Sequence, residues 1–144
     1  NFFNYINQLS KLNAFVKQEI NKIPVERRVL VTAHDAFGYF GKAYNMDVVG
    51  LQGISTVAEA SVKDIETVSN LVVSKDVPAI FIESSVPKRA IKALQAAVKA
   101  KGKQVTIGEE LFTDAMGSKG KPEGTYIGMI KHNVNSIVSG LTQK

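Results

Sequence analysis

Three side chains able to bind a metal ion or transfer a proton follow apolar segments of the chain. His34 ends the run 29–33, Glu83 ends the run 79–82, and Asp114 lies in a loop after a further predicted strand. In a parallel α/β sheet the carboxyl ends of the strands lie side by side, and ligands bind in crevices at that edge. An imidazole and a carboxylate at one edge suit a divalent metal ion. We therefore expect His34 and Asp114 to be metal ligands.

The same residue types are compatible with other roles. A histidine after a strand is more often packed or hydrogen-bonded than a ligand, and Asp114 equally suits a turn cap or a lysine partner. Two carboxylates and an imidazole also form the general acid, general base and orienting group of many enzymes. Glu59, after the second predicted strand, is a further candidate for the crevice, whereas His132 falls in the middle of a predicted helix. Spacing alone leaves the metal-binding and enzyme interpretations open.

Hydrophobic periodicity predicts the elements that position these residues. Apolar residues recur every three or four positions in the predicted helices, and the predicted strands are continuous apolar runs, typical of strands buried on both faces. Ser61 and Asp64 have the spacing of a helix-capping box. Alternating strands and helices favour a doubly wound, three-layer α/β/α fold with a four-stranded parallel sheet. The predicted helices span 4–22, 36–44, 62–74, 87–101 and 124–141, and the predicted strands 29–32, 47–51, 79–82 and 104–107.

Composition narrows the class of protein. The chain has 144 residues, a net charge of +5 and no cysteine, which excludes disulfides and thiolate metal ligands and suits an extracytoplasmic protein. Lysines are spread along the sequence and the three arginines are not interleaved with aromatic residues, so we expect no nucleic-acid partner. No apolar run approaches the ~20 residues of a membrane-spanning helix. The first residues also lack the basic region of a signal peptide.

Five motifs, in order, resemble one known family over essentially the whole chain. The similarity is to the zinc/manganese solute-binding proteins of bacterial ABC transporters, the TroA-like (cluster A-I) family. The motifs are Thr-Ala-His-Asp-Ala-Phe-Gly-Tyr-Phe (32–40), Gly-Ile-Ser-Thr-Val-Ala-Glu-Ala-Ser (53–61), Phe-Ile-Glu-Ser-Ser (81–85), Phe-Thr-Asp-Ala-Met-Gly (112–117), and Gly-Thr-Tyr (124–126) with Lys-His-Asn (131–133).

The resemblance implies a two-lobed protein of which this chain is the second part. Residues 1–23 would be the distal part of a long helix that connects the lobes, and residues 24–144 the C-terminal metal-binding lobe. The family holds its metal between the lobes with two ligands from each, and His34 and Asp114 match the pair from the second lobe. Glu83 matches a family glutamate, which we interpret as lining the crevice or orienting a ligand, and Glu59 has a similar supporting role. The first lobe and its two ligands have no counterpart here.

The implied function is transport without catalysis. We expect a receptor for zinc or manganese, with iron also suited to the donor set, that delivers its cargo to the membrane permease of an ABC importer. The expected location is the periplasm, or the cell surface as a lipoprotein. The alternatives are a small-substrate α/β enzyme that uses His34, Glu83 and Asp114, and a surface adhesin or other interaction module.

Overall fold

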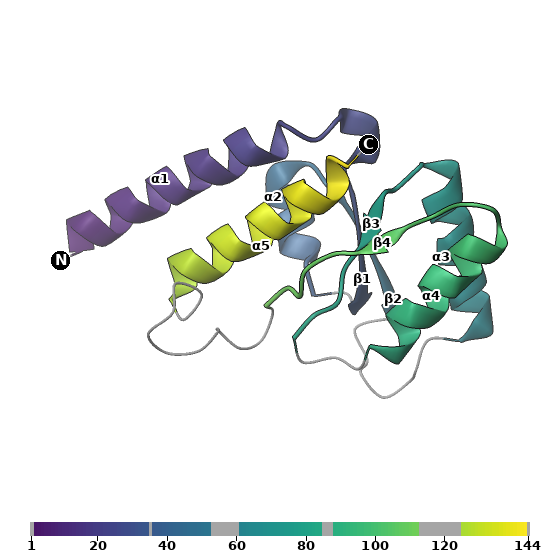
Figure 1. The fold of residues 1–144 in the computed structure, drawn as a ribbon. Coiled ribbons are helices and arrows are strands. Elements are labelled where there is room, and N and C mark those ends of the chain that lie inside the picture. Colours follow the sequence, from purple (N-terminus) through teal and green to yellow (C-terminus); the bar gives the residue numbers. More distant parts are fainter. Residues whose placement is uncertain (1, 35, 53–60, 85–87, 113–124, 144) are drawn as a thin grey trace.

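Helices alternate with parallel strands along the chain (Figure 1). The computed structural model describes residues 2–34, 36–52, 61–84, 88–112 and 125–143. The α/β class expected from the sequence is confirmed. The elements are α1 (Phe2–Ile20), the 3-10 turn η1 (Val25–Arg27), β1 (Val29–His34), α2 (Gly38–Tyr44), β2 (Asp47–Gln52), α3 (Val62–Ser74), β3 (Ala79–Ile80), α4 (Arg89–Ala100), β4 (Thr106–Ile107) and α5 (Tyr126–Leu141).

The strands pair in parallel as two two-stranded sheets. In one sheet β1 pairs with β2, from Val29 opposite Asp47 to His34 opposite Gln52, and in the other β3 pairs with β4. A single bridge from Thr32 to Phe81 connects the two sheets, and the Phe81 N–H donates to the Val31 carbonyl at 2.9 Å. All four strands therefore run the same way and end at the same edge.

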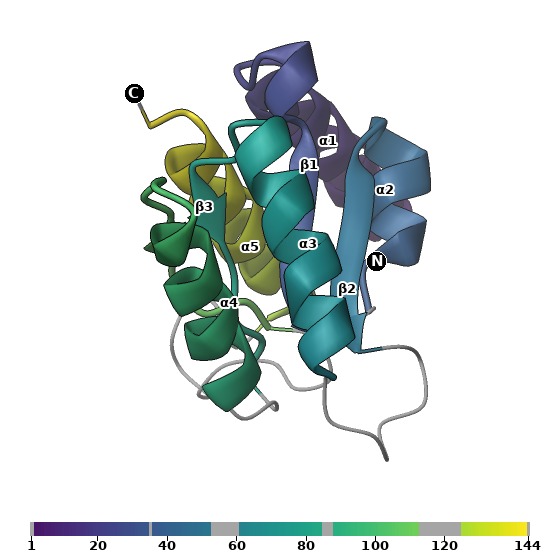
Figure 2. The ribbon, with the colours of Figure 1, turned by 90° about the vertical axis from the view of Figure 1, so that its right-hand side faces the viewer.

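Helices lie on both sides of the strands (Figure 2). The helices α3 and α4 pack against each other on one side, and α5 lies on the other side with α1 packed against it. The two inner strands, β1 and β3, are enclosed, since Leu30, Val31 and Ile80 are 0% exposed, whereas β2 and β4 are partly exposed. This explains why the sequence of the strands shows continuous apolar runs instead of alternation.

Most predicted elements agree with the structure to within a few residues. Helix α3 has the predicted bounds, and the capping box is present: the Ser61 hydroxyl accepts from the Asp64 N–H, and the Asp64 carboxylate accepts from the Ser61 N–H. The third strand is shorter than predicted, ending at Ile80 instead of residue 82. Its regular pairing stops because the neighbouring segment loses register: the Gly108 N–H bonds to the Ile80 carbonyl, but the next bond to this strand, at the Ile82 carbonyl, comes from Leu111. Glu83 then pairs with Leu111 as an isolated bridge.

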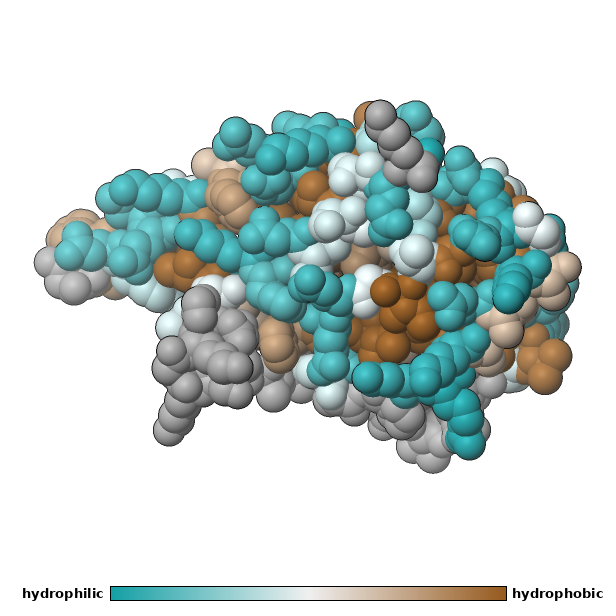
Figure 3. Space-filling model, viewed as in Figure 1, coloured by the Kyte–Doolittle hydropathy of each residue, from teal (hydrophilic) through white to brown (hydrophobic). Residues whose placement is uncertain are grey.

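The surface is mainly hydrophilic on the face that α1 and α5 present (Figure 3). Apolar side chains are exposed at the free end of α1, where Phe2 and Phe3 are 72% and 79% exposed. Within the described residues, no helix combines the length and apolar character needed to cross a bilayer.

Candidate metal site

His34 is the last residue of β1, at the carboxyl edge of the strands. Its backbone is held firmly, because its carbonyl accepts from the Thr32 hydroxyl at 2.7 Å and from the Ala36 N–H at 2.9 Å. Its imidazole Nε2 is buried and has no hydrogen-bond partner in the described part of the chain. Buried polar atoms are nearly always paired, so this nitrogen calls for a partner beyond the described residues.

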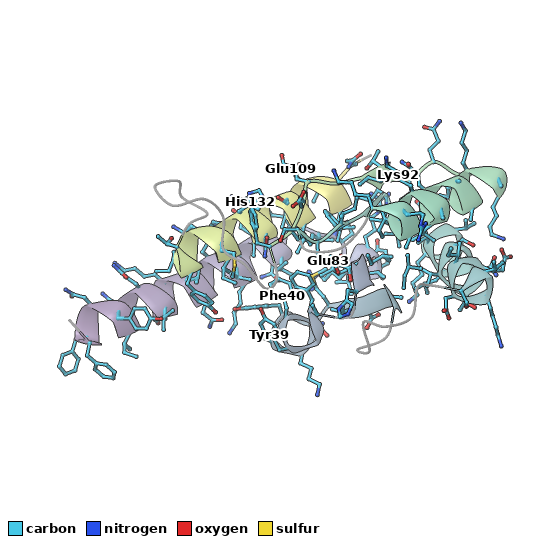
Figure 4. The ribbon with its side chains drawn as sticks, turned by 90° about the horizontal axis from the view of Figure 1, so that it is seen from below. Tyr39, Phe40, Glu83, Lys92, Glu109 and His132 are labelled. Carbon is cyan, nitrogen blue, oxygen red and sulfur yellow. The ribbon has the colours of Figure 1, made fainter. Side chains whose placement is uncertain are left out.

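Glu83, labelled in Figure 4, comes from the chain segment that follows β3 and bonds to the backbone of His34. Its side chain is 1% exposed, and its two carboxylate oxygens accept from the backbone N–H groups of His34 at 2.8 Å and Ala33 at 3.2 Å. Burial raises the pKa of this carboxyl above its ordinary 4.5, while the hydrogen bonds from the His34 and Ala33 backbone oppose that rise. The carboxylate thus fixes the strand that carries His34 and, in this structure, contacts the backbone of His34.

The segment that leads to Asp114 runs next to Glu83. Leu111 donates its N–H to the Ile82 carbonyl and accepts at its own carbonyl from the Ser84 N–H, both at 2.8 Å. Leu111 is only three positions before Asp114 in the sequence. The described part of this segment, which ends at residue 112, therefore runs at the same edge as His34, as the sequence predicts. Asp114 and Glu59 themselves lie outside the described residues, and their roles stay predictions.

Two further polar side chains at this edge were not predicted as site residues. The Ser84 hydroxyl is buried and, like His34 Nε2, has no hydrogen-bond partner among the described residues. Asn133, in α5, is 4% exposed and bonds twice to the backbone of Phe112. The spacing of α5 contained a signal for Asn133, since it falls on the same apolar stripe as Met129, Ile130 and Ile137.

His132, which lies within a helix as predicted, contacts the segment that precedes Asp114. Its ring Nε2 donates to the Glu110 carbonyl at 2.9 Å, and its ring packs against Phe112 with centroids 5.0 Å apart. It also lines a groove of about 600 Å³ along α5, together with Glu109 and Ser136. In Figure 4, His132 and Glu109 lie beside α5, away from Glu83. Neither His34 nor Glu83 is among the described residues that line this groove.

Within the described residues, this edge has one imidazole nitrogen without a hydrogen-bond partner, on His34, and a carboxylate, Glu83, that holds the His34 backbone. No three histidine or acidic side chains come together within the described ranges to form a complete metal site. One imidazole is too few ligands for a transition metal, which takes four or more. The geometry therefore fits a partial site, completed by ligands from elsewhere.

Comparison with known proteins gives consistent matches over the whole chain. A family model described as the periplasmic zinc-uptake complex component A matches residues 1–140. The chain is 52% identical to the zinc-binding protein TroA of Treponema pallidum over 96% of its own length, and 47% identical to the manganese-binding lipoprotein MntA of Bacillus subtilis over 95%. It spans about 45% of the length of each of these curated relatives.

A solved structure shows the same fold. The chain superposes on the periplasmic zinc-binding protein TroA from Treponema pallidum with a TM-score of 0.93 and 51% identity, and covers 51% of that chain.

Proposed function

The chain belongs to the family of the periplasmic zinc-uptake complex component A, and from this membership we propose that it is the C-terminal, metal-binding lobe of an extracytoplasmic solute-binding protein. In this proposal residues 1–23 form the distal part of the connecting helix and residues 24–144 the lobe. The four strands act as one parallel sheet in a three-layer lobe. The Thr32–Phe81 bridge between the two sheets supports this arrangement.

The observation that carries the proposal is the buried, unpaired Nε2 of His34. Leaving such an atom unsatisfied costs a folded protein about 1–3 kcal/mol. A neutral imidazole nitrogen is also a good ligand for zinc and manganese. The buried Glu83 carboxylate holds the backbone of His34. The ring nitrogen, which has no partner among the described residues, is therefore available to bind a cation.

In this proposal His34 and Asp114 supply two of the metal ligands. Two more come from the first lobe, so that the metal ion lies between the lobes. Zinc and manganese are the cargo named for the two curated relatives, and both accept an imidazole and carboxylate donor set. Glu83 supports His34 through its backbone, and Glu59 is proposed to line the crevice.

The mechanism of such a protein is capture without catalysis. A metal ion held by both lobes favours one arrangement of the lobes by its higher affinity for that arrangement. The permease of an ABC importer then recognises the loaded form and takes up the metal. We place the protein in the periplasm or on the cell surface as a lipoprotein.

The test measures metal affinity in the natural, full-length protein that contains this chain. Zinc and manganese are titrated at pH 7.5 against a competing chelator, for the unmodified protein and for the variants His34→Ala and Asp114→Ala. Supporting groups around metal ligands are worth 10- to 100-fold in affinity, so loss of a direct ligand is expected to cost more than about 100-fold.

His132→Ala is the matched control, because it removes the other histidine of the chain. Its nitrogen already bonds to the Glu110 carbonyl and its ring packs on Phe112, so the variant should lose much less affinity than His34→Ala does. Unchanged affinity in His34→Ala, or an equal loss in His132→Ala, would show that the metal binds elsewhere.

A further inference from the structure

Asn133 makes an unusual pair of hydrogen bonds from the buried side of α5. Its Oδ1 accepts from the Phe112 N–H at 2.9 Å, and its Nδ2 donates to the Phe112 carbonyl at 2.8 Å. One side-chain amide thereby satisfies both backbone groups of one residue. The pairing resembles that of a neighbouring strand, because it offers one donor and one acceptor to a single extended residue.

This amide is buried, so contact with solvent does not explain why a polar residue stands here. Asn133 is 4% exposed, and its neighbours on α5, Val134 and Ile137, are both 0% exposed. A buried amide is costly unless its hydrogen bonds are made, and an apolar residue would fill the same place without that cost. The amide therefore has a positive role, which is to hold Phe112.

Phe112 is the residue from which the chain reaches Asp114. Asp114 follows Phe112 by only two residues in the sequence, and two residues span at most about 7 Å. On its other side Phe112 follows Leu111, which bonds to Ile82 and Ser84, beside Glu83. A continuous hydrogen-bonded frame thus joins the backbone of His34, through Glu83 and Leu111, to Phe112 and Asn133.

We propose that Asn133 is a positioning residue for Asp114. It rests on the proposed function, since it takes Asp114 to be a metal ligand. The two hydrogen bonds from Asn133 order the Phe112 backbone before metal binds, and preorganised ligands bind more tightly because less conformational entropy is lost on binding. Asn133 itself does not contact the metal.

The experiment replaces Asn133 with leucine, which has a similar volume and cannot make either hydrogen bond. Asn133→Leu is expected to weaken zinc binding by the full-length protein about 10- to 100-fold, the usual size of a supporting effect. Ser136→Ala is the matched control, because Ser136 is another buried polar residue of α5 (6% exposed) that bonds to His132 and Glu109 instead of Phe112. That variant should retain the unmodified affinity.

A double-mutant cycle separates positioning from a general structural role. If Asn133 acts through Asp114, Asn133→Leu has less than about a twofold effect in a protein that already carries Asp114→Ala. An equal loss in both backgrounds would overturn the proposal. Normal affinity in Asn133→Leu alone would also overturn it while leaving the proposed function intact, whereas normal affinity in Asp114→Ala would remove both.

Hydrogen exchange supplies a second measurement that does not depend on metal. The Phe112 amide is expected to be protected in the unmodified protein, because its N–H donates to the Asn133 side chain, and to exchange faster in Asn133→Ala, which lacks that acceptor. This variant tests the proposal if Asn133→Leu does not fold. Unchanged exchange at Phe112 together with normal zinc affinity in Asn133→Ala would count against it.

Discussion

The two ends of the parallel strands are built in opposite ways. At the amino end, charged residues that precede the strands form ion pairs that solvent reaches. Asp76 pairs with Arg27 and with Lys103, and Arg27 also donates to the Gln143 carbonyl. At the carboxyl end, polar groups are buried, and His34 Nε2 and Ser84 Oγ have no partner among the described residues.

This difference suggests that the two ends serve different purposes, stability at the amino end and binding at the carboxyl end. Exposed ion pairs contribute little and tolerate change, because solvent screens them. Buried polar groups are costly to keep, so those at the carboxyl end indicate a purpose other than folding. The contrast predicts that substitutions at the carboxyl end change metal binding, and that substitutions at the amino end change only stability.

The largest expected effect is at His34, where one substitution should lower metal affinity and raise stability. His34→Leu should lower zinc affinity of the full-length protein more than about 100-fold and raise the free energy of unfolding of the metal-free protein by about 1 kcal/mol, because the unpaired buried nitrogen is gone. Competition titration and urea unfolding measure the two quantities. His132→Leu, which loses a made hydrogen bond, should show neither change. A His34→Leu protein that is less stable without metal would indicate a structural partner for the imidazole.

Glu83→Gln should destabilise the metal-free protein by about 1–3 kcal/mol. Glutamine has one acceptor oxygen where glutamate has two, so one of the two backbone N–H groups at Ala33 and His34 loses its partner in a buried place. Urea unfolding measures the loss, and Glu110→Gln, an exposed glutamate on the nearby chain, is the control. Equal stability of the two variants would mean that the Glu83 carboxylate does not hold β1.

A smaller effect is expected at Gly102, at the amino end. Gly102 has φ +87° with open space around it, so an added Cβ meets no neighbour and the cost comes from the backbone alone. Gly102→Ala should lose about 1 kcal/mol of unfolding free energy, and Gly102→Asn less, because asparagine adopts left-handed conformations more readily. Thermal unfolding compares the two. Zinc affinity should stay unchanged in both, and any loss of it would break the contrast between the ends.

The smallest effect is expected for Asp76→Asn. The Lys103 ammonium bonds to Asp76 and holds the pKa of that carboxyl below its ordinary 3.8, so the stabilisation is complete above about pH 3.8 and is lost as the pH falls through the lower folded-state pKa. The variant should therefore have a slightly lower Tm at pH 7, and the difference should disappear on acidification or in high salt. Because asparagine tolerates the φ of +53° at this position, backbone strain does not contribute. A difference that persists in acid would point to a cause other than charge.

The sequence predicted local features best. The position of His34 at a strand end and the Ser61–Asp64 capping box both follow from short-range patterns, and both are confirmed. The end of the third strand was predicted two residues too late. An apolar run does not reveal where the neighbouring segment loses register, which here happens between Gly108 and Leu111.

The sequence did not reveal which residues far apart along the chain contact each other. Glu83 was expected at the edge, but its carboxylate binds backbone N–H groups 49 and 50 residues away in the sequence. Asn133 bonds to a residue 21 positions away, and an asparagine within a helix suggests no such partner by itself. A polar residue on an apolar stripe is the pattern that would have justified asking what it binds.

The contacts between the two sheets also bear on metal preference. His34 extends from β1 in one sheet, while the chain up to Phe112 is bonded to residues that follow β3 in the other. Among the described residues, Thr32, Phe81 and Glu83 connect these two halves. Under the proposed function, substitutions at these three residues should therefore change which cation the protein prefers.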